Sequence, residues 1–563
     1  MMPEQVARSP HWVGPFQAPR RPLFPCLRFA AGLRIQAWGR RLEVAKMRPV
    51  ERIATALIVV QCLAIFSAHA APPDCPGSTQ TPWPTKDWEA STPEAQGMDS
   101  AALARLVDRV GAYKQDSLLV IRHGKIVADA YYAPFAPNIR HDLRSVTKSF
   151  IGTLTAIEVQ EGLLDSVDHT VVDLFADKHI SNVDDAKKAM TVQNMLDMTS
   201  GIAWQEHAYT PDETIIRMYK TPDPTEFVLS QPMSDPPGAR FYYNGGNPYV
   251  LSALITRKAG RDALDFARDE LFKPLGISSV RWGDADQQGV TDGESGLYLA
   301  PHDMAKLGYL YLHQGLWDGQ QIIPSSWVDR VRQGPVKATY GLHYANLWWS
   351  LPDRDAFMAL GRHSQIILVL PKLDVVAVTT GVRKDDEYFP TTALIDGIAG
   401  AVRSDASLAP DSAGQALLAA SIQKAATEQA TPVGPAPELA KTISGKSYRL
   451  SENDLHVKTF SLNLADPNPS WEYTSASERL DRPTARFTGP IGIDGLFRKG
   501  SARYGIDAVK GSWLDDHTFV VERRILGHGE MQRWTLGFDG KKVNVKFEST
   551  DGAEVELHGE ADE

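Results

Sequence analysis

A serine and a lysine lie three residues apart in the segment HDLRSVTKSF, residues 141–150. Side chains at this spacing lie on one face of an α-helix, so Ser145 and Lys148 would be neighbours if a helix begins here. Apolar residues recur at helical intervals from Val146 to Ile157, and Lys148 is the only charged residue between them. We therefore expect a helix that is buried nearly all round.

Burial would suit this pair to acyl transfer. Desolvation lowers the pKa of a lysine from its usual value of about 10.4, so that the amine can accept a proton near neutral pH. A serine hydroxyl is a weak nucleophile until a base takes its proton, and N–H groups at a helix start favour the negative charge of the attack. Ser145 and Lys148 are thus candidates for nucleophile and base. Ser421 and Lys424 have the same spacing in an Ala-rich segment without a buried context, and we assign them no function.

The first 70 residues are predicted to be a leader. The segment MRPVERIATALIVVQCLAIFSAHAAPP, which begins at Met47, has a basic start, an apolar stretch from Ile53 to Phe66 and an A-x-A cleavage site ending at Ala70. We therefore expect Met47 to be the true start. A membrane anchor is the alternative, but the apolar stretch is shorter than the roughly 20 residues that a spanning helix needs. The expected protein is periplasmic or secreted, without stable membrane insertion after signal cleavage.

Composition narrows the function classes. A chain of 563 residues suggests two or more domains, and 43% hydrophobic and 23% charged residues are ordinary for a globular protein. The leader carries a net charge of +7, so its removal changes the formal net charge from −10 to −17, which argues against nucleic-acid binding. Only Cys75 would remain of the three cysteines. Neither an intrachain disulfide framework nor a cysteine-built metal site is therefore expected.

Strands at both ends of a helical region predict how the serine and lysine are held. MDSAALARLVDRV is typical of a helix capped by Asp99 or Ser100. SLLVIRHGKIVADAYY predicts a hairpin that turns at His123-Gly124, and IILVLPKLDVVAVTTG a second one that turns at Pro371 to Asp374. The region between is mostly helical. We predict an α+β domain in which helices cover an antiparallel sheet, with an inserted helical lobe.

The composition changes near residue 403. Residues 403–441 are rich in Ala, Pro and Ser and are predicted to be a linker, with one possible helix at Ala413–Glu428. After Lys441, short runs such as TFVVERRI and KVNVKFEST are separated by Gly and Asp turns. Residues 442–563 are therefore predicted to be an all-β domain, either a small barrel or a sandwich.

A resemblance to a known family rests on several segments in the right order. These are RSVTKSFIGTLTAIEVQEGLLDSVD, TVQNMLDMTSGIAW, PPGARFYYNGGNPYVLSALI, GESGLYLAPHDMAKLGYLYLHQG and GRHSQIILVLPKLDVVAVTTG. They resemble the serine hydrolases of the class C β-lactamase and penicillin-binding-protein fold, above all the 6-aminohexanoate-dimer (nylon-oligomer) hydrolases and related esterases. The resemblance covers residues 83–402 and implies a β-lactamase/transpeptidase-like fold, no cofactor, and Ser145 and Lys148 as nucleophile and base. The C-terminal β domain is similar to the lipocalin-like domains appended to some members.

The family's second motif implies a tyrosine that handles protons. Aligning on Pro237-Gly238 and Phe241 assigns the functional phenol to Tyr243. The alternative register, Tyr242-Tyr243-Asn244, matches Tyr-x-Asn literally but displaces the phenylalanine, and we prefer Tyr243. Gly245 then stands where the family usually has a polar side chain. A phenol beside an ammonium can relay the serine proton and later donate it to the leaving group.

The third motif departs from the family pattern. In ALGRHSQII, Gly361 takes the position of the motif glycine, so that the backbone N–H of Arg362 would join that of Ser145 in an oxyanion hole. Ser364 replaces a second expected glycine, and the lysine of Lys-Thr-Gly is absent. Recognition of a β-lactam carboxylate is therefore in doubt, whereas acyl transfer is not.

Further residues are weaker candidates for contact with substrate. They are Tyr209, aligned with a substrate-contacting tyrosine of the nylon-oligomer hydrolases, Trp348 and Trp349 as pocket walls, and His363. A paired tryptophan or a lone histidine is more often structural. Asp303 is interpreted as lying near a helix start.

Other chemistries lack sequence support. The chain contains no G-x-S-x-G, no H-E-x-x-H and no Gly-rich phosphate loop. We therefore expect an exported serine hydrolase that acts on a small ester or amide. The alternatives are β-lactamase or D-alanyl-D-alanine peptidase activity, or a catalytically silent sensor that keeps the penicillin-binding fold.

Overall fold

The structure, a computed structural model, describes residues 83–207, 210–382, 390–475, 485–502 and 505–562. The predicted leader, Cys75 and the candidate residue Tyr209 lie outside these residues. None of the described helices is long and apolar enough to cross a membrane.

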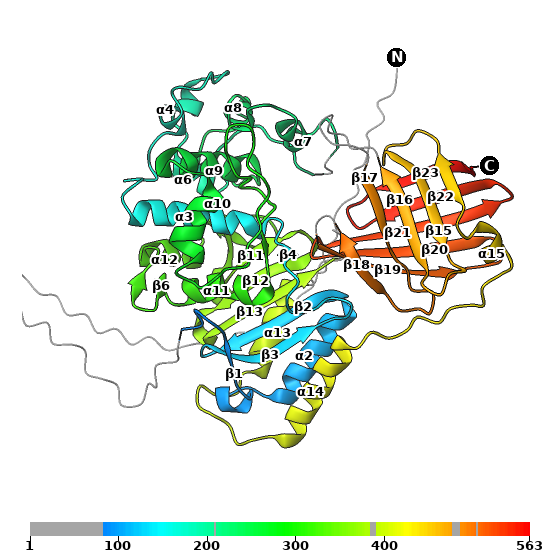
Figure 1. Cartoon of the computed structure of the whole chain (residues 1–563). Coiled ribbons are helices and arrows are strands. Elements are labelled where there is room, and N and C mark those ends of the chain that lie inside the picture. The colour runs from blue at the N-terminus through cyan, green and yellow to red at the C-terminus, as the bar shows by residue number, and fades with distance from the viewer. Residues whose placement is uncertain (1–82, 208–209, 383–389, 476–484, 503–504, 563) are drawn as a thin grey trace, which may run out of the picture. The chain divides into compact units, whose positions relative to one another are not determined.

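A nine-stranded sheet organises the first part of the chain (Figure 1). Its order is β1-β3-β2-β13-β12-β11-β10-β9-β8, antiparallel throughout except for the parallel pair β1 and β3. The strands are β1 (Glu89–Ala90), β2 (Gln115–Arg122), β3 (Lys125–Tyr131), β8 (Val336–Lys337), β9 (His343–Ala345), β10 (Trp348–Leu351), β11 (Ala356–Gly361), β12 (Gln365–Leu370) and β13 (Val375–Gly381). The antiparallel sheet agrees with the predicted fold class.

Both predicted hairpins are present. His123 and Gly124 join β2 to β3 with φ angles of 50° and 69°, which lie in the left-handed region that tight turns need. A short 3₁₀ turn at Pro371–Leu373, followed by Asp374, joins β12 to β13. These hairpins pair with each other through β2 and β13.

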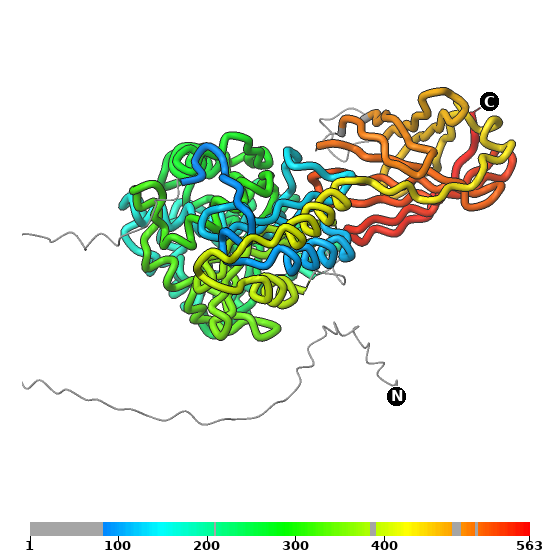
Figure 2. The backbone as a smooth tube through the Cα atoms, turned by 90° about the horizontal axis from the view of Figure 1, so that it is seen from below, coloured from blue at the N-terminus to red at the C-terminus, as the bar shows by residue number. Residues whose placement is uncertain are grey.

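Three helices cover one face of the sheet: α2 (Ser100–Ala112), α13 (Thr391–Ala401) and α14 (Ser412–Ala426). Asp99 is the cap of α2, because its side chain accepts a hydrogen bond from the N–H of Ala102 at 2.8 Å. The predicted linker contains α14, which packs beside α2 (Figure 2). Alternate strand residues, such as Leu118 and Leu368, point toward these helices.

The other face of the sheet supports the helical lobe. Leu119, Ile367 and Val376 point into a core shared with α3, α9 and α11. The helices of this region are α3 (Val146–Gln160), α4 (Val171–Leu174), α5 (Asp185–Lys188), α6 (Val192–Leu196), α7 (Thr214–Tyr219), α8 (Pro224–Leu229), α9 (Gly246–Ala259), α10 (Ala263–Ala267), α11 (Pro301–Leu312) and α12 (Ser325–Gln333). Asp303 lies in the first turn of α11, near a helix start as interpreted. Two short pairs complete the region, β4 (His141–Asp142) with β5 (Tyr298–Leu299) and β6 (Leu316–Trp317) with β7 (Gln320–Gln321).

The C-terminal domain is a nearly closed barrel of ten antiparallel strands. After α15 (Leu439–Ile443), the strand order is β17-β16-β15-β14-β23-β22-β21-β20-β19-β18, and the two end strands β17 and β18 contact each other. The strands are β14 (Ser447–Leu450), β15 (Val457–Asn463), β16 (Ser470–Ser475), β17 (Ala485–Pro490), β18 (Arg498–Ala502), β19 (Gly505–Trp513), β20 (Thr518–Leu526), β21 (Glu530–Asp539), β22 (Lys542–Ser549) and β23 (Glu554–Ala561). Its core is aromatic, with Trp471, Tyr473 and Trp534 in contact. Of the two predicted architectures, the barrel is the one observed.

Candidate active site

Helix α3 carries the candidate nucleophile at its start. Ser145 is the cap residue of this helix and is half-buried, whereas every helix residue from Val146 to Glu158 is buried. The preceding residue, Arg144, has a φ of 50°, so the chain turns sharply into the helix at the serine. The hydroxyl therefore lies at the edge of the core, on a helix that is buried nearly all round as predicted.

Lys148 contacts the serine directly. Its ammonium Nζ donates to Ser145 Oγ at 2.8 Å, and only 1% of the lysine is exposed. Nζ also donates to the main-chain oxygen of Glu294 at 3.0 Å and to Glu294 Oε1 at 2.9 Å. The lysine is therefore held between the hydroxyl and a carboxylate, a partner that sequence analysis missed.

The pairing of β4 with β5 explains how Glu294 reaches the lysine. His141 lies opposite Leu299, and the N–H of Leu143 donates to the carbonyl of Leu297 at 2.8 Å. The segment just before β5 is thus fixed against the start of α3. The only signal for Glu294 in the sequence was its place in the family segment GESGLYL, which assigned it no role.

The charge of the ammonium acts on three carboxyl groups, of which Glu294 contacts it directly. Burial raises the pKa of Glu294, but Lys148 and its hydrogen bonds outweigh burial, so the net pKa is below its usual value. For Glu206 and Asp292, burial and the charge of Glu294 together raise the pKa to about 7. Tyr219 ties the group together by donating to Asp292 Oδ2 at 2.9 Å and to Glu294 Oε2 at 3.0 Å. Part of this cluster titrates near neutral pH.

Tyr243 rather than Tyr242 lies beside the lysine. Lys148 Nζ is 5.1 Å from the centroid of the Tyr243 ring, which stacks on Trp349 at 5.9 Å with an interplanar angle of 19°. The hydroxyl of Tyr242 instead donates to the main-chain oxygen of Trp204 at 2.7 Å. Asn244 is buried and accepts a hydrogen bond from the N–H of Gly246 at the start of α9. The geometry agrees with the preferred register.

Glu206 fills the place of the polar side chain that Gly245 lacks. The N–H of Gly245 donates to Glu206 Oε2 at 2.6 Å. A Cβ atom at Gly245 would lie only 2.8 Å from this oxygen and 2.8 Å from Cγ of Glu294. A larger residue would therefore displace the carboxylates that surround Lys148.

The third motif lies against the backbone next to the nucleophile. Gly361 ends β11, and a Cβ there would be 2.4 Å from the carbonyl oxygen of Leu143 and 3.2 Å from the nitrogen of Val146. Glycine is needed for this close approach. Arg362 follows directly, so its N–H lies in the segment that passes the serine. Ser364, at the place of the second expected glycine, has a φ of 69°, a conformation that favours glycine.

The remaining candidates lie in different surroundings. His363 is fully buried, and its Nε2 lies 2.8 Å from Oδ1 of Asp551 in the C-terminal domain. Trp348 is also fully buried, with its ring centroid 4.3 Å from that of Tyr311, so Trp349 is the tryptophan that contacts Tyr243. Within the described part of the chain, no group of three or more His, Cys, Asp or Glu side chains is arranged to hold a metal ion.

The second S-x-x-K pair has the surroundings of a surface contact. Ser421 Oγ and Lys424 Nζ each lie 3.2 Å from a carboxylate oxygen of Asp108, at an exposed contact between α14 and α2. Identical spacing thus occurs here without burial and without a serine–lysine hydrogen bond between the two side chains.

Comparison with known proteins identifies the family of the chain. The model of the beta-lactamase family matches residues 100–399. The 6-aminohexanoate-dimer hydrolase of Paenarthrobacter ureafaciens is 25% identical over 317 residues, which cover 53% of this chain and 79% of that protein. Among solved structures, a penicillin-binding protein homologue of Caulobacter crescentus has a TM-score of 0.41 and 17% identity over 50% of this chain and 91% of its own. The octameric penicillin-binding protein homologue of Pyrococcus abyssi has a TM-score of 0.43 and 15% identity over 81% of this chain and 99% of its own. The family match confirms the resemblance seen in the sequence, and the chain belongs to the beta-lactamase family of serine hydrolases.

Proposed function

We propose that this protein is an exported hydrolase that cleaves a small ester or amide through an acyl-enzyme on Ser145. The observation that carries the proposal is the 2.8 Å hydrogen bond between Lys148 Nζ and Ser145 Oγ, in which the lysine is fully buried and the serine is half-buried. Export rests on the leader pattern that ends at Ala70.

The proposed mechanism moves one proton at each step. Ser145 Oγ attacks the substrate carbonyl carbon while its proton passes to the unprotonated form of Lys148, and Glu294 stabilises the ammonium that results. The N–H groups of Ser145 and Arg362 stabilise the oxyanion. The bond to the leaving group then breaks, and Tyr243 or Lys148 donates the proton that this group needs. Water then attacks the acyl-enzyme carbonyl while Lys148 or Tyr243 accepts one of its protons, and that proton passes to Ser145 Oγ as the acyl bond breaks, which releases the acid and restores the serine.

The third motif favours substrates without a carboxylate next to the reacting bond. In a Lys-Thr-Gly motif a lysine is available to an anionic substrate, whereas here the basic side chains of Arg362 and His363 contact Asp551. We therefore propose esterase or amide-oligomer hydrolase activity ahead of β-lactamase or D-alanyl-D-alanine peptidase activity. The identity of the 25% identical relative as a 6-aminohexanoate-dimer hydrolase supports the amide class.

Activity-based labelling tests the nucleophile. The full chain is expressed in a bacterial host, the exported form is purified, and its N-terminus is sequenced. We expect a fluorophosphonate probe to label Ser145 alone. Turnover of p-nitrophenyl esters should fall by at least about a thousandfold in Ser145→Ala and Lys148→Ala and less in Tyr243→Phe. Ser421→Ala is the matched control and should keep full activity. A folded wild type that neither labels nor turns over would favour the silent sensor instead.

A further inference from the structure

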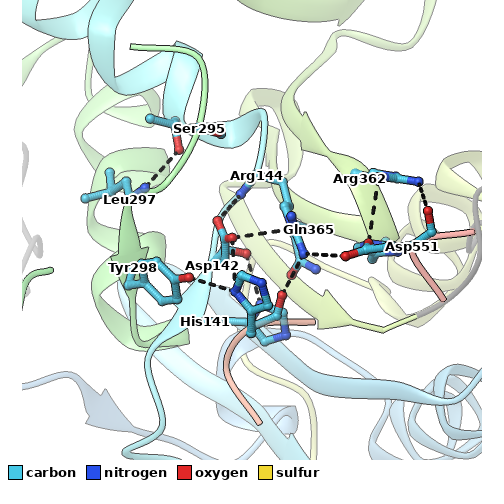
Figure 3. A network of polar contacts seen from close by, with 12 residues as sticks. His141, Asp142, Arg144, Ser295, Leu297, Tyr298, Arg362, Gln365 and Asp551 are labelled. Atoms are coloured by element: carbon cyan, nitrogen blue, oxygen red, sulfur yellow. Dashed lines mark hydrogen bonds and ion pairs between the residues drawn. The ribbon is translucent and has the colours of Figure 1, made fainter. Parts of the chain in front are cut away.

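Two hairpin tips of the C-terminal barrel contact the two segments that flank the candidate nucleophile. One tip joins β20 to β21 and contains Gly527–Gly529, and the other joins β22 to β23 and contains Asp551. The segments that they contact are residues 141–144, which lead into Ser145, and residues 361–365, the third motif. Figure 3 shows Arg144, Arg362 and Asp551 meeting in one polar network.

Asp551 connects both segments through a single carboxylate. Oδ1 lies 2.8 Å from His363 Nε2 and 3.7 Å from Arg362 Nη1, while Oδ2 lies 3.6 Å from Arg144 Nη2. The main-chain oxygen of Asp551 also accepts from Arg362 Nη2 at 3.3 Å. Burial opposes ionisation, but the His363 hydrogen bond and the two arginines hold the pKa of Asp551 well below its usual range. The carboxylate is therefore charged at neutral pH.

The other tip, Gly527–Gly529, binds residues 141–144 through its main-chain carbonyl groups. The carbonyl of Gly527 accepts from the N–H of Asp142 at 2.6 Å, and that of His528 accepts from Arg144 Nη2 at 2.9 Å. His528 Nδ1 also lies 2.8 Å from the hydroxyl of Tyr298 in β5. Beside them, the side chain of Asp116 in β2 binds both His141 and Arg524. Because Arg524 lies in β20, Asp116 also connects the sheet with the barrel.

The residues held in this way have unfavourable backbone conformations. Arg144, His363 and Ser364 have φ angles of 50°, 66° and 69°, although none of them is glycine. Such conformations cost free energy and persist where the surroundings over-determine them. Arg144 precedes Ser145, and His363 follows Arg362. Arg144 and His363 are thus adjacent in sequence to the two residues whose N–H groups are assigned to the oxyanion hole.

We propose that the C-terminal barrel completes the active site, and that Asp551 is a positioning residue that holds the oxyanion-hole segments in place through Arg144, Arg362 and His363. Asp551 acts through these side chains and does not contact the substrate. The inference rests on the proposed function, because it assigns a role in the acyl transfer at Ser145. It gives the appended domain a part in catalysis beyond stability.

The test compares Asp551 with a second acidic contact between the barrel and the rest of the chain. Glu428 Oε1 accepts from the N–H of Phe497 at 2.7 Å and touches none of the site residues, so Glu428→Ala is the matched control. Asp551→Ala and the milder Asp551→Asn are made in the full chain. For each variant we would measure the melting temperature, kcat and KM for a p-nitrophenyl ester, and the affinity for a boronic acid that mimics the tetrahedral intermediate.

A positioning role predicts a kinetic signature that loss of stability would not produce. Misplacement of a catalytic group by about 1 Å costs on the order of a hundredfold in rate, so kcat should fall by about 10- to 100-fold in Asp551→Ala, with KM little changed. Boronate affinity should fall in parallel, because it depends on the same N–H groups. Asp551→Asn, which can still accept from His363, should lose less. Glu428→Ala should keep the wild-type kcat.

Three outcomes separate the inference from the proposed function. If Asp551→Ala and Asp551→Asn, both folded, keep the kcat and boronate affinity of Glu428→Ala, the positioning role is overturned and the acyl-enzyme proposal stands. If Asp551→Ala does not fold, Asp551→Asn alone decides by the same comparison. If the wild type is neither labelled by fluorophosphonate nor active, both proposals fail together.

Discussion

Glu158, on the helix that carries Lys148, should make the stability of the protein depend on pH. Its side chain is fully buried near the end of α3, and neither carboxylate oxygen has a hydrogen-bond partner among the described residues. Burial raises the pKa of Glu158 to about 8, against the attraction of Lys258. The folded protein therefore binds a proton here that the unfolded chain releases near pH 4.5.

The sign and size of the effect follow from this difference in pKa. Between about pH 4.5 and pH 8 the folded state binds more protons than the unfolded state, so stability falls as the pH rises and levels off above the folded pKa. At about 1.4 kcal/mol per pKa unit, the whole window corresponds to a loss on the order of 5 kcal/mol. At pH 7 the stability should already be roughly 3 kcal/mol below its value at acidic pH.

Replacement by glutamine removes the titrating group and keeps the shape. We would measure the urea unfolding of the wild type and Glu158→Gln by circular dichroism from about pH 5 to pH 8. Over this range the free energy of unfolding of the wild type should decrease by several kcal/mol more than that of the variant. Glu452→Gln, at an exposed position of the barrel, should follow the wild type. Parallel curves for the wild type and Glu158→Gln would refute the reasoning, because they would mean that Glu158 is ionised in the folded protein at little cost.

Two further substitutions test the packing around buried charges. Gly245→Ser, which restores the family's polar residue, should lower kcat about tenfold or more, because its Cβ would lie 2.8 Å from atoms of Glu206 and Glu294. The double variant Gly245→Ser/Glu206→Ala should recover activity. A double variant as inactive as Gly245→Ser would contradict this account. Inside the barrel, Arg523→Met would leave the buried carboxylate of Asp507 without the arginine that binds it at 2.8 and 3.0 Å, and should cost about 3–5 kcal/mol in urea unfolding. Adding Asp507→Leu should restore most of this stability. If Arg523→Met alone is as stable as the wild type, the ion pair between Arg523 and Asp507 does not stabilise the barrel.

Local patterns were enough to predict the elements that carry the site. The hairpins turning at His123-Gly124 and near Pro371 are specified by residues within a few positions of each turn, and helix α3 by the apolar run that follows Ser145. The proximity of Lys148 to Ser145 follows from helical spacing alone. Each of these features depends on contacts close in sequence, so single-sequence reasoning could reach them.

The charges around the lysine depend on contacts that are distant in sequence. Glu294 is 146 residues from Lys148, and Asp551 is 188 residues from His363. No periodicity or turn signal connects such positions. Burial of α3 was predictable, but the same helix holds two buried ionisable groups in opposite ways: Lys148 is paired with a carboxylate, and Glu158 lacks a hydrogen-bond partner among the described residues. The pairing of β4 with β5 supplies the partner of Lys148.

The contacts of Asp551 connect the appended domain with the choice of substrate. A family member that binds an anionic β-lactam needs a cation at the third motif, and here the basic side chains of that motif, Arg362 and His363, lie against the Asp551 carboxylate. An anionic substrate would have to compete with a half-buried carboxylate that is fixed by the barrel, and it would lose the Coulombic gain that an available lysine gives. A neutral ester or amide meets no such competition. The hairpin that would hold the oxyanion segments in place would therefore also disfavour carboxylate-bearing substrates. We expect Asp551→Ala to lower kcat/KM for neutral and for anionic esters. The loss should be smaller for the anionic esters, so that the preference for neutral esters decreases.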